Sequence, residues 1–169
     1  MPDYQSAYRR NFSCETALIE LVDNILWGFE FSRNTAKISL DLSAAFDTVD
    51  HSILLQVLKS RFGLHDTVLN WFCTYLSSRS CVVCIEGSKS EPSHLPFSVP
   101  QGSVAGPYLY LAYASTLHEA IPSGLYLHGF ADDHAIKISY PAGDELHELA
   151  AAEALEDASK DIGSWMAKN

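Results

Sequence analysis

The sequence has few basic residues for a chain of its length. Its 169 residues include 11 lysines and arginines against 21 aspartates and glutamates, which gives a formal net charge of −10. A protein that binds nucleic acid mainly by neutralising phosphates needs the opposite balance. Seven of the acidic residues lie between Asp144 and Asp161, with Lys160 as the single base, and the rest of the chain is closer to neutral. We therefore expect only weak nucleic-acid binding from this chain alone.

Long apolar runs, low-complexity tracts and internal repeats are also absent. No apolar run approaches the roughly 20 residues that cross a bilayer. Residues 1–11 are polar, and no apolar signal core follows Arg9 and Arg10. These absences favour an intracellular protein of the cytoplasm or nucleus, not secreted and without a membrane partner. With 47% hydrophobic residues, the chain is large enough for one globular domain, which we place at 1–169.

The sequence contains only four cysteines. Cys81 and Cys84 form a single C-x-x-C pair, but a structural zinc site ordinarily needs a second ligand pair with similar spacing. The segment around them is β-branched and typical of a strand, in which the two sulfurs would face opposite sides. We predict reduced thiols that pack as small hydrophobic side chains.

Hydrophobic periodicity and turn residues predict interleaved helices and strands. Ser13 is a candidate N-cap for a helix that ends before Ser32. Further helices are predicted over 52–62, from an Asp66 cap to Leu76, over 106–117 and over 144–165, the last with Leu146, Leu149, Ala152 and Leu155 on one stripe. Strands are predicted over 36–42, 80–86, 95–99, 125–131 and 134–140. This order predicts an α+β fold, an antiparallel sheet with helices packed on one face.

Two adjacent aspartates, Asp132 and Asp133, lie at the predicted tip of the hairpin between 125–131 and 134–140. Two neighbouring carboxylates repel each other unless a cation lies between them. The alternative is an ordinary two-residue turn, because Asp favours such positions. Taken alone, the pair is better explained as a turn.

Asp41 favours a metal site over a plain turn. It ends another apolar strand, where an unpaired charge is costly. If that strand lies beside the hairpin, Asp41, Asp132 and Asp133 meet at one edge of the sheet. Such hard oxygen ligands suit Mg²⁺ or Mn²⁺. Two ions about 4 Å apart would then catalyse phosphoryl or nucleotidyl transfer.

Segments around these aspartates resemble the reverse transcriptases of non-LTR (LINE-like) retrotransposons. Residues 40–51, LDLSAAFDTVDH, resemble motif A, residues 99–107, VPQGSVAGP, resemble motif B, and residues 130–133, FADD, resemble motif C. A block at 5–11 and 16–18 resembles the one that precedes motif A. The order and spacing agree over nearly the whole chain. The resemblance implies a right-hand polymerase palm with part of the fingers.

The resemblance implies a metal-binding role for four positions. Asp41, Asp132 and Asp133 would be catalytic and would bind two ions of Mg²⁺ or Mn²⁺. The backbone carbonyl of Leu42 would be a further ligand.

The resemblance also implies contacts with the incoming nucleotide. Phe46 would be the steric gate that rejects a 2′-hydroxyl, with plain core packing as its alternative. The Ala45 N–H and Gln101 would touch the nucleotide, and Gly102 would allow the backbone to approach it closely.

Four further residues belong to these motifs without an assigned role. We interpret Asp47, Asp50 and His51 as structural or surface residues, not ligands. His134 stands where the family often has Thr, and we favour a solvent-facing neighbour of the site over a metal ligand or base.

The sequence departs from the family in several places. It begins after the fingers segment that supplies basic residues to the triphosphate, and it ends where motif D starts, without a thumb. Residues 113–117 differ from the usual pattern, and Ala105 stands where Leu is usual. We therefore expect a domain truncated at both ends, with exposed apolar surface where other parts would dock.

These inferences lead to one main hypothesis and two alternatives. The main hypothesis is an RNA-directed DNA polymerase core that uses Mg²⁺ or Mn²⁺, an RNA template, a DNA primer 3′-hydroxyl and deoxynucleoside triphosphates. The first alternative is a catalytically inert, retrotransposon-derived palm that still binds metal. The second is a binding or interaction module whose contact surface is the acidic helix over 144–161.

Overall fold

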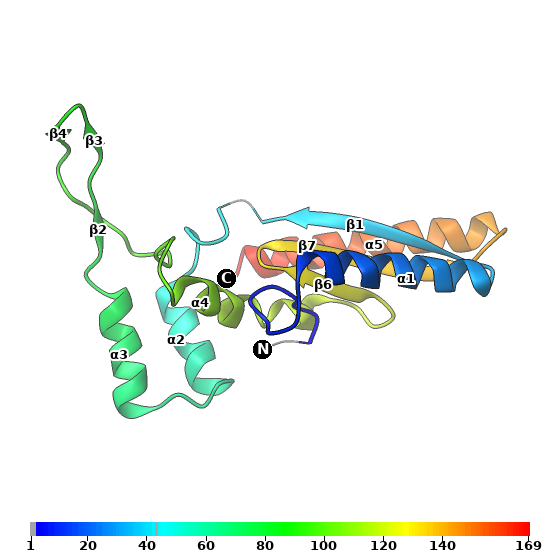
Figure 1. The fold of residues 1–169 in the computed structure, drawn as a ribbon, viewed down its shortest axis with the longest axis horizontal. Helices are drawn as coiled ribbons and strands as arrows, with labels where there is room; N and C mark the ends of the chain where they lie inside the picture. Colours follow the sequence, from blue (N-terminus) through cyan, green and yellow to red (C-terminus); the bar gives the residue numbers. More distant parts are fainter. Residues whose placement is uncertain (1–2, 43) are drawn as a thin grey trace. The chain divides into compact units, whose positions relative to one another are not determined.

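The computed structural model describes residues 3–42 and 44–169, so Ser43 of the motif around Asp41 lies outside the described residues. The chain divides into two compact units (Figure 1). One unit comprises Met1–Ser43 and Ala114–Lys168, and the other comprises Ala44–Tyr113 with Asn169. The candidate carboxylates all belong to the first unit. The placement of one domain at 1–169 stays a prediction.

The first unit is organised around a three-stranded antiparallel sheet with the order β1-β7-β6. Its strands are β1 (Arg33–Asp41), β6 (Tyr126–Phe130) and β7 (Asp133–Pro141). Strand β1 pairs with β7 over its whole length, from Arg33 opposite Pro141 to Asp41 opposite Asp133. The strand predicted at 36–42 and the predicted hairpin are therefore present, and the end of β1 lies beside the start of β7.

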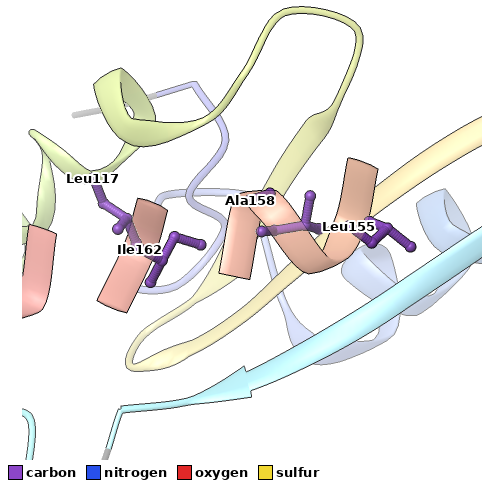
Figure 2. Packing of buried hydrophobic residues seen from close by; sticks show 5 residues of the cluster. Leu117, Leu155, Ala158 and Ile162 are labelled. Carbon is purple, nitrogen blue, oxygen red and sulfur yellow. The ribbon is translucent and has the colours of Figure 1, made fainter. Parts of the chain in front are cut away.

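One face of this sheet packs against helix α5 (Glu145–Met166), which begins at an Asp144 N-cap. The core joins Ile136 of β7 to Leu155, Ala158 and Ile162 of α5 and to Leu117. Figure 2 shows the α5 side chains and Leu117 along this contact. Leu117 opens a short 3-10 helix, η1 (Leu117–Ala120), so the helix predicted over 106–117 ends earlier, at Ala114.

The predicted apolar stripe of α5 is wrong except at Leu155. Leu146 is 75% exposed and Leu149 is 60% exposed, and Ala152 is exposed as well. Helix α5 carries apolar residues on more than one stripe, and the stripe with Ala151 and Ala158 faces the sheet. Alanine at these positions lets the helix approach the strands closely, which a stripe of leucines would prevent.

Helix α1 (Cys14–Glu30) lies over the other face of the sheet. It begins as predicted at Ser13, whose side chain and backbone exchange hydrogen bonds with Thr16. A short turn at Phe31 and Ser32 returns the chain directly from α1 into β1. Gly28 fits against β1, because a Cβ there would lie 3.1 Å from the Arg33 carbonyl oxygen. Figure 1 shows α1 and α5 running along the same three strands.

Helices therefore cover both faces of the sheet, and the prediction of helices on one face is wrong. Helix α1 joins β1 through the two-residue turn at Phe31 and Ser32, and the conformation of that turn, which hydrophobic periodicity does not specify, places α1 over the face opposite to α5. Much of α1 stays exposed, including Leu18, Ile19, Val22, Leu26, Trp27 and Phe29. Within the described part of the chain, no helix is long and apolar enough to cross a membrane.

The second unit consists of helices and short strand pairs. Its helices are α2 (His51–Ser60), α3 (Asp66–Leu76) and most of α4 (Gly106–Ala114), and its strands are β2 (Ser80–Cys81), β3 (Cys84–Ile85), β4 (Ser88–Lys89) and β5 (Ser93–His94). Asp66 opens α3 but does not cap it, because His65 holds the N-cap position. Buried Leu54, Val57 and Leu58 form the inner face of α2.

The segment predicted as one strand over 80–86 is divided between two strand pairs. Strand β2 pairs with β5, and β3 pairs with β4 around Gly87. No return strand forms over 95–99. All four cysteines are free and exposed, so the prediction that they pack as small hydrophobic side chains is wrong. Cys81 lies in β2 and Cys84 in β3, two short strands whose residues are all exposed.

Candidate active site

Asp41 and Asp133 lie directly opposite each other, at the end of β1 and the start of β7. Directly opposite residues in an antiparallel pair point to the same face, with Cβ atoms about 5 Å apart. Both residues are exposed. Across residues 3–42 and 44–169, neither carboxylate forms an ion pair with a basic side chain. Two carboxylates thus share one end of the sheet without a basic side chain paired to them among the described residues.

Asp132 occupies the turn between β6 and β7. Phe130 pairs with Asp133, so the two turn residues are Ala131 and Asp132. The predicted turn of Asp132 and Asp133 is therefore displaced by one residue. Ala131 takes the positive φ of 58° that tight hairpin turns commonly require. Asp133 is consequently a strand residue, and this places it in register with Asp41.

The expected meeting of three carboxylates is only partly realised. The structure brings Asp41 and Asp133 together, but no group of three His, Cys, Asp or Glu side chains in the described ranges is arranged to hold a metal ion. Two uncompensated carboxylates on one face are nevertheless the hard, anionic donors that Mg²⁺ accepts alongside waters and substrate phosphates. The donor set therefore fits a divalent cation, with Asp132 adjacent in the turn. Leu42, the predicted backbone ligand, is 7% exposed.

His134 is buried, so its interpretation as a solvent-facing residue is wrong. It follows Asp133 along β7, and strand alternation turns its side chain to the opposite face. It is 2% exposed, and its Nδ1 lies 2.8 Å from the Asp132 carbonyl oxygen, to which it donates. Burial lowers the pKa of His134, because desolvation disfavours the charged ring. Gly129 lies directly opposite His134 in the strand pair. A Cβ at Gly129 would lie 3.3 and 3.4 Å from atoms of the His134 ring, so glycine leaves room for the ring.

A cavity of about 510 Å³ separates α1 from the sheet face that carries Asp41 and Asp133. Lys37 and Lys137 line it as well, and they too lie directly opposite each other. The basic pair lies four residues along the strands from the acidic pair, a distance of about 13 Å. The face therefore has a negative end and a positive end.

His128 also lines this cavity, in the strand beside β7. Burial lowers its pKa, although the Glu20 carboxylate, 3.8 Å from Nδ1, opposes that effect. The sequence reasoning missed His128 and the two lysines. A signal was present for the lysines, because Lys37 and Lys137 each lie four residues from the aspartate at the end of their strand and so share its face. His128 lies in β6, which has no aspartate at its end, so strand alternation gave no such signal for it.

The predicted nucleotide contacts lie in the second unit. Ala45 is buried, and the ring of Phe46 stacks on Tyr110 with centroids 4.9 Å apart. The Phe46 carbonyl accepts a hydrogen bond from the Val99 N–H at 2.9 Å. This hydrogen bond ties motif A to motif B.

Motif B forms a tight turn before α4. Gln101 and Gly102 are exposed, and Gly102 has a φ of +77°. The Ser103 hydroxyl donates to the Pro100 carbonyl at 2.7 Å and accepts from the Gly106 N–H at 2.9 Å. A Cβ at Gly106 would lie 2.7 Å from the Pro100 carbonyl oxygen, so this position requires glycine. The nucleotide contacts of Ala45, Phe46, Gln101 and Gly102 stay predictions.

Comparison with known proteins gives a consistent result. Residues 1–169 match the family described as reverse transcriptase (RNA-dependent DNA polymerase). The probable RNA-directed DNA polymerase from transposon BS of Drosophila melanogaster is 30% identical over 98% of this chain and 18% of its own length. That from transposon X-element of the same species is 29% identical over 97% of this chain and 18% of its own length.

A third relative is the RNA-directed DNA polymerase from mobile element jockey of Drosophila melanogaster, 30% identical over 80% of this chain and 15% of its own length. The chain thus spans less than a fifth of each relative's length. The matched region nevertheless includes all three motifs in order. The chain belongs to the reverse transcriptase family, as a domain of the non-LTR retrotransposon type.

Proposed function

We propose that this chain carries the nucleotidyl-transfer centre of a reverse transcriptase, which adds deoxynucleotides to a primer 3′-hydroxyl opposite an RNA template. The observation that carries the proposal is the pairing of Asp41 with Asp133 at the end of β1 and β7. Like charges directly opposite in a sheet are destabilising. A divalent cation bound between the two carboxylates would offset their repulsion.

Asp41 and Asp133 would hold Mg²⁺ or Mn²⁺, with Asp132 and the Leu42 carbonyl as further ligands. Two bound ions would activate the attacking hydroxyl and stabilise the leaving oxygen. The contribution of the protein is to fix the two carboxylates through the strand register, so that little reorganisation is needed when the ions and substrate bind.

The nucleotide would be selected by residues of motifs A and B. Phe46 would exclude a ribose 2′-hydroxyl, and its stacking on Tyr110 would hold the ring in one orientation. The Ala45 N–H and Gln101 would contact the nucleotide beside Gly102. In this proposal the chain is a palm with part of the fingers, acts inside the cell, and needs flanking parts of a longer protein to bind primer and template firmly.

An inert palm is the second candidate. It is supported by the exposed acidic residues of α5, which suit contact with a partner protein better than contact with nucleic acid. Such a chain would bind a metal ion without catalysis, and α5 would offer a contact surface to a partner.

Primer extension tests the two candidates. The purified chain is incubated with an oligo(dT) primer on poly(rA), deoxynucleoside triphosphates and Mg²⁺ or Mn²⁺, beside Asp41→Asn. Asp47→Asn is the matched control, because Asp47 is an exposed aspartate of the same motif. Extension by the chain and the control, but not by Asp41→Asn, supports the polymerase. No extension, together with Mn²⁺ binding that Asp41→Asn abolishes, supports the inert palm.

A further inference from the structure

Gln5 is a deeply buried polar residue of the first unit, with 1% of its surface exposed. Its Oε1 accepts hydrogen bonds from the Ala131 N–H at 2.9 Å and from the Ala7 N–H at 3.0 Å. Its Nε2 donates to the Ala131 carbonyl at 3.1 Å. One side-chain amide therefore pairs with both backbone groups of a single turn residue.

The backbone around Gln5 is attached to the same hairpin. Gln5 forms a parallel bridge with Gly129 of the edge strand β6. The Ser6 N–H donates to the Gly129 carbonyl at 2.9 Å, and the Gly129 N–H donates to the Tyr4 carbonyl at 2.8 Å. The Tyr4 hydroxyl donates to the Ala114 carbonyl at 2.8 Å, which anchors the segment at its other side. Gln5 is thus presented to the turn by a fixed backbone.

The hydrogen bonds at this position need a side-chain amide. Ala131 is a non-glycine residue with a φ of 58°, a conformation that persists only when its surroundings hold it. An amide supplies the acceptor and the donor that the two backbone groups of Ala131 need, whereas a carboxylate lacks the donor and an aliphatic side chain lacks both. A Cβ at Gly129 would lie 3.0 Å from Gln5 Nε2, so glycine there makes room for the amide.

We propose that Gln5 is a positioning residue for the metal centre. By fixing Ala131, it sets the turn at Asp132 and the first residue of β7, and so holds Asp133 opposite Asp41. This inference rests on the proposed function for its catalytic meaning. The hydrogen bonds between Gln5 and Ala131, which we call the clamp, form in the chain without bound metal.

Amide hydrogen exchange, measured by NMR on the full chain without metal, tests the clamp. In the unmodified chain, Ala131 should exchange about as slowly as Ile136 of the central strand, although it lies in a turn. Gln5→Met keeps the side-chain volume but removes both hydrogen-bonding groups. In this variant, exchange at Ala131 should become about tenfold faster or more, compared with exchange at Ile138. The reason is that the Ala131 N–H loses its hydrogen-bond acceptor. Gln56→Met, on the exposed face of α2, should change neither residue.

Mn²⁺ binding by the same variants tests the positioning role. Affinity measured by electron paramagnetic resonance should fall in Gln5→Met and remain unchanged in Gln56→Met. In the unmodified chain, exchange at Ala131 as fast as at Gly87 overturns the clamp. Equal acceleration of Ala131 and Ile138 in Gln5→Met overturns it as well. If the unmodified chain shows no Mn²⁺ binding that depends on Asp41, the proposed function fails, while the exchange rates still decide the clamp.

Discussion

The facing carboxylates of Asp41 and Asp133 have a measurable consequence in the absence of metal. Because like charges opposite each other repel, Asp133→Asn should raise the free energy of unfolding by about 0.5 kcal/mol in chelator and low salt. Urea unfolding monitored by circular dichroism measures this change. Asp47→Asn should leave stability nearly unchanged. A loss of stability in Asp133→Asn would show that the carboxylate is compensated within the protein.

His128 predicts a dependence of stability on pH. Burial lowers its pKa below 6.5, the lysines Lys137 and Lys37 act in the same direction, and Glu20 opposes them. Between that lowered pKa and the unfolded value of about 6.5, the unfolded chain binds more protons. The contribution of His128 to stability is therefore complete above about pH 6.5 and is lost as pH falls through this window.

Urea unfolding at a series of pH values measures this effect. His128→Gln should flatten the decline below about pH 6.5 without abolishing it, because burial also lowers the pKa of His134. His94→Gln, in an exposed strand, is the matched control and should keep the full decline. An unchanged slope in His128→Gln would mean that the ring is solvated in the folded chain.

At the scale of elements, Asp50 is the N-cap of α2. Its carboxylate accepts from the Ser52 N–H at 2.7 Å and the Ile53 N–H at 2.9 Å. Asp50→Ala should lower the free energy of unfolding by about 1 kcal/mol, and Asp50→Asn should retain most of it. Thermal and urea denaturation measure the difference. Equal stability of the Ala and Asn variants would refute the capping role.

The contact between α5 and the sheet gives a second prediction at this scale. Leu155→Ala removes a buried side chain from the core and should destabilise the chain by about 2–5 kcal/mol. Leu149→Ala, on the exposed part of the same helix, should change stability by less than about 0.5 kcal/mol. Similar losses of stability in both variants would show that Leu149 is buried, as the stripe predicted from the sequence requires.

At the scale of the whole molecule, the sequence predicts individual helices and strands better than it predicts how they pack against one another. The cap at Ser13 and the periodicity after it define α1, and the alternation before Asp41 defines β1, because both signals are local. The choice between two apolar stripes on α5 depends on the sheet that it meets. The side of the sheet that α1 covers depends on the conformation of the short turn between α1 and β1, which hydrophobic periodicity does not predict.

The candidate site shows the same division. The motifs identified Asp41, Asp132 and Asp133 by type and order. The pairing of Asp41 with Asp133, and the burial of His134, follow from a register that a shift of one residue would reverse. That register depends on the turn at Ala131, which Gln5 holds from 126 residues away in the sequence. Sequence order alone carries no signal for that contact.

A titration with Mn²⁺, followed by electron paramagnetic resonance, tests the central claim most directly. The claim is that the facing aspartates at the end of β1 and β7 form a divalent-metal centre. The unmodified chain and Asp47→Asn should bind Mn²⁺, Mg²⁺ should compete for the site, and Asp41→Asn and Asp133→Asn should each abolish binding. Equal binding by all four proteins, or binding by none of them, would contradict the claim.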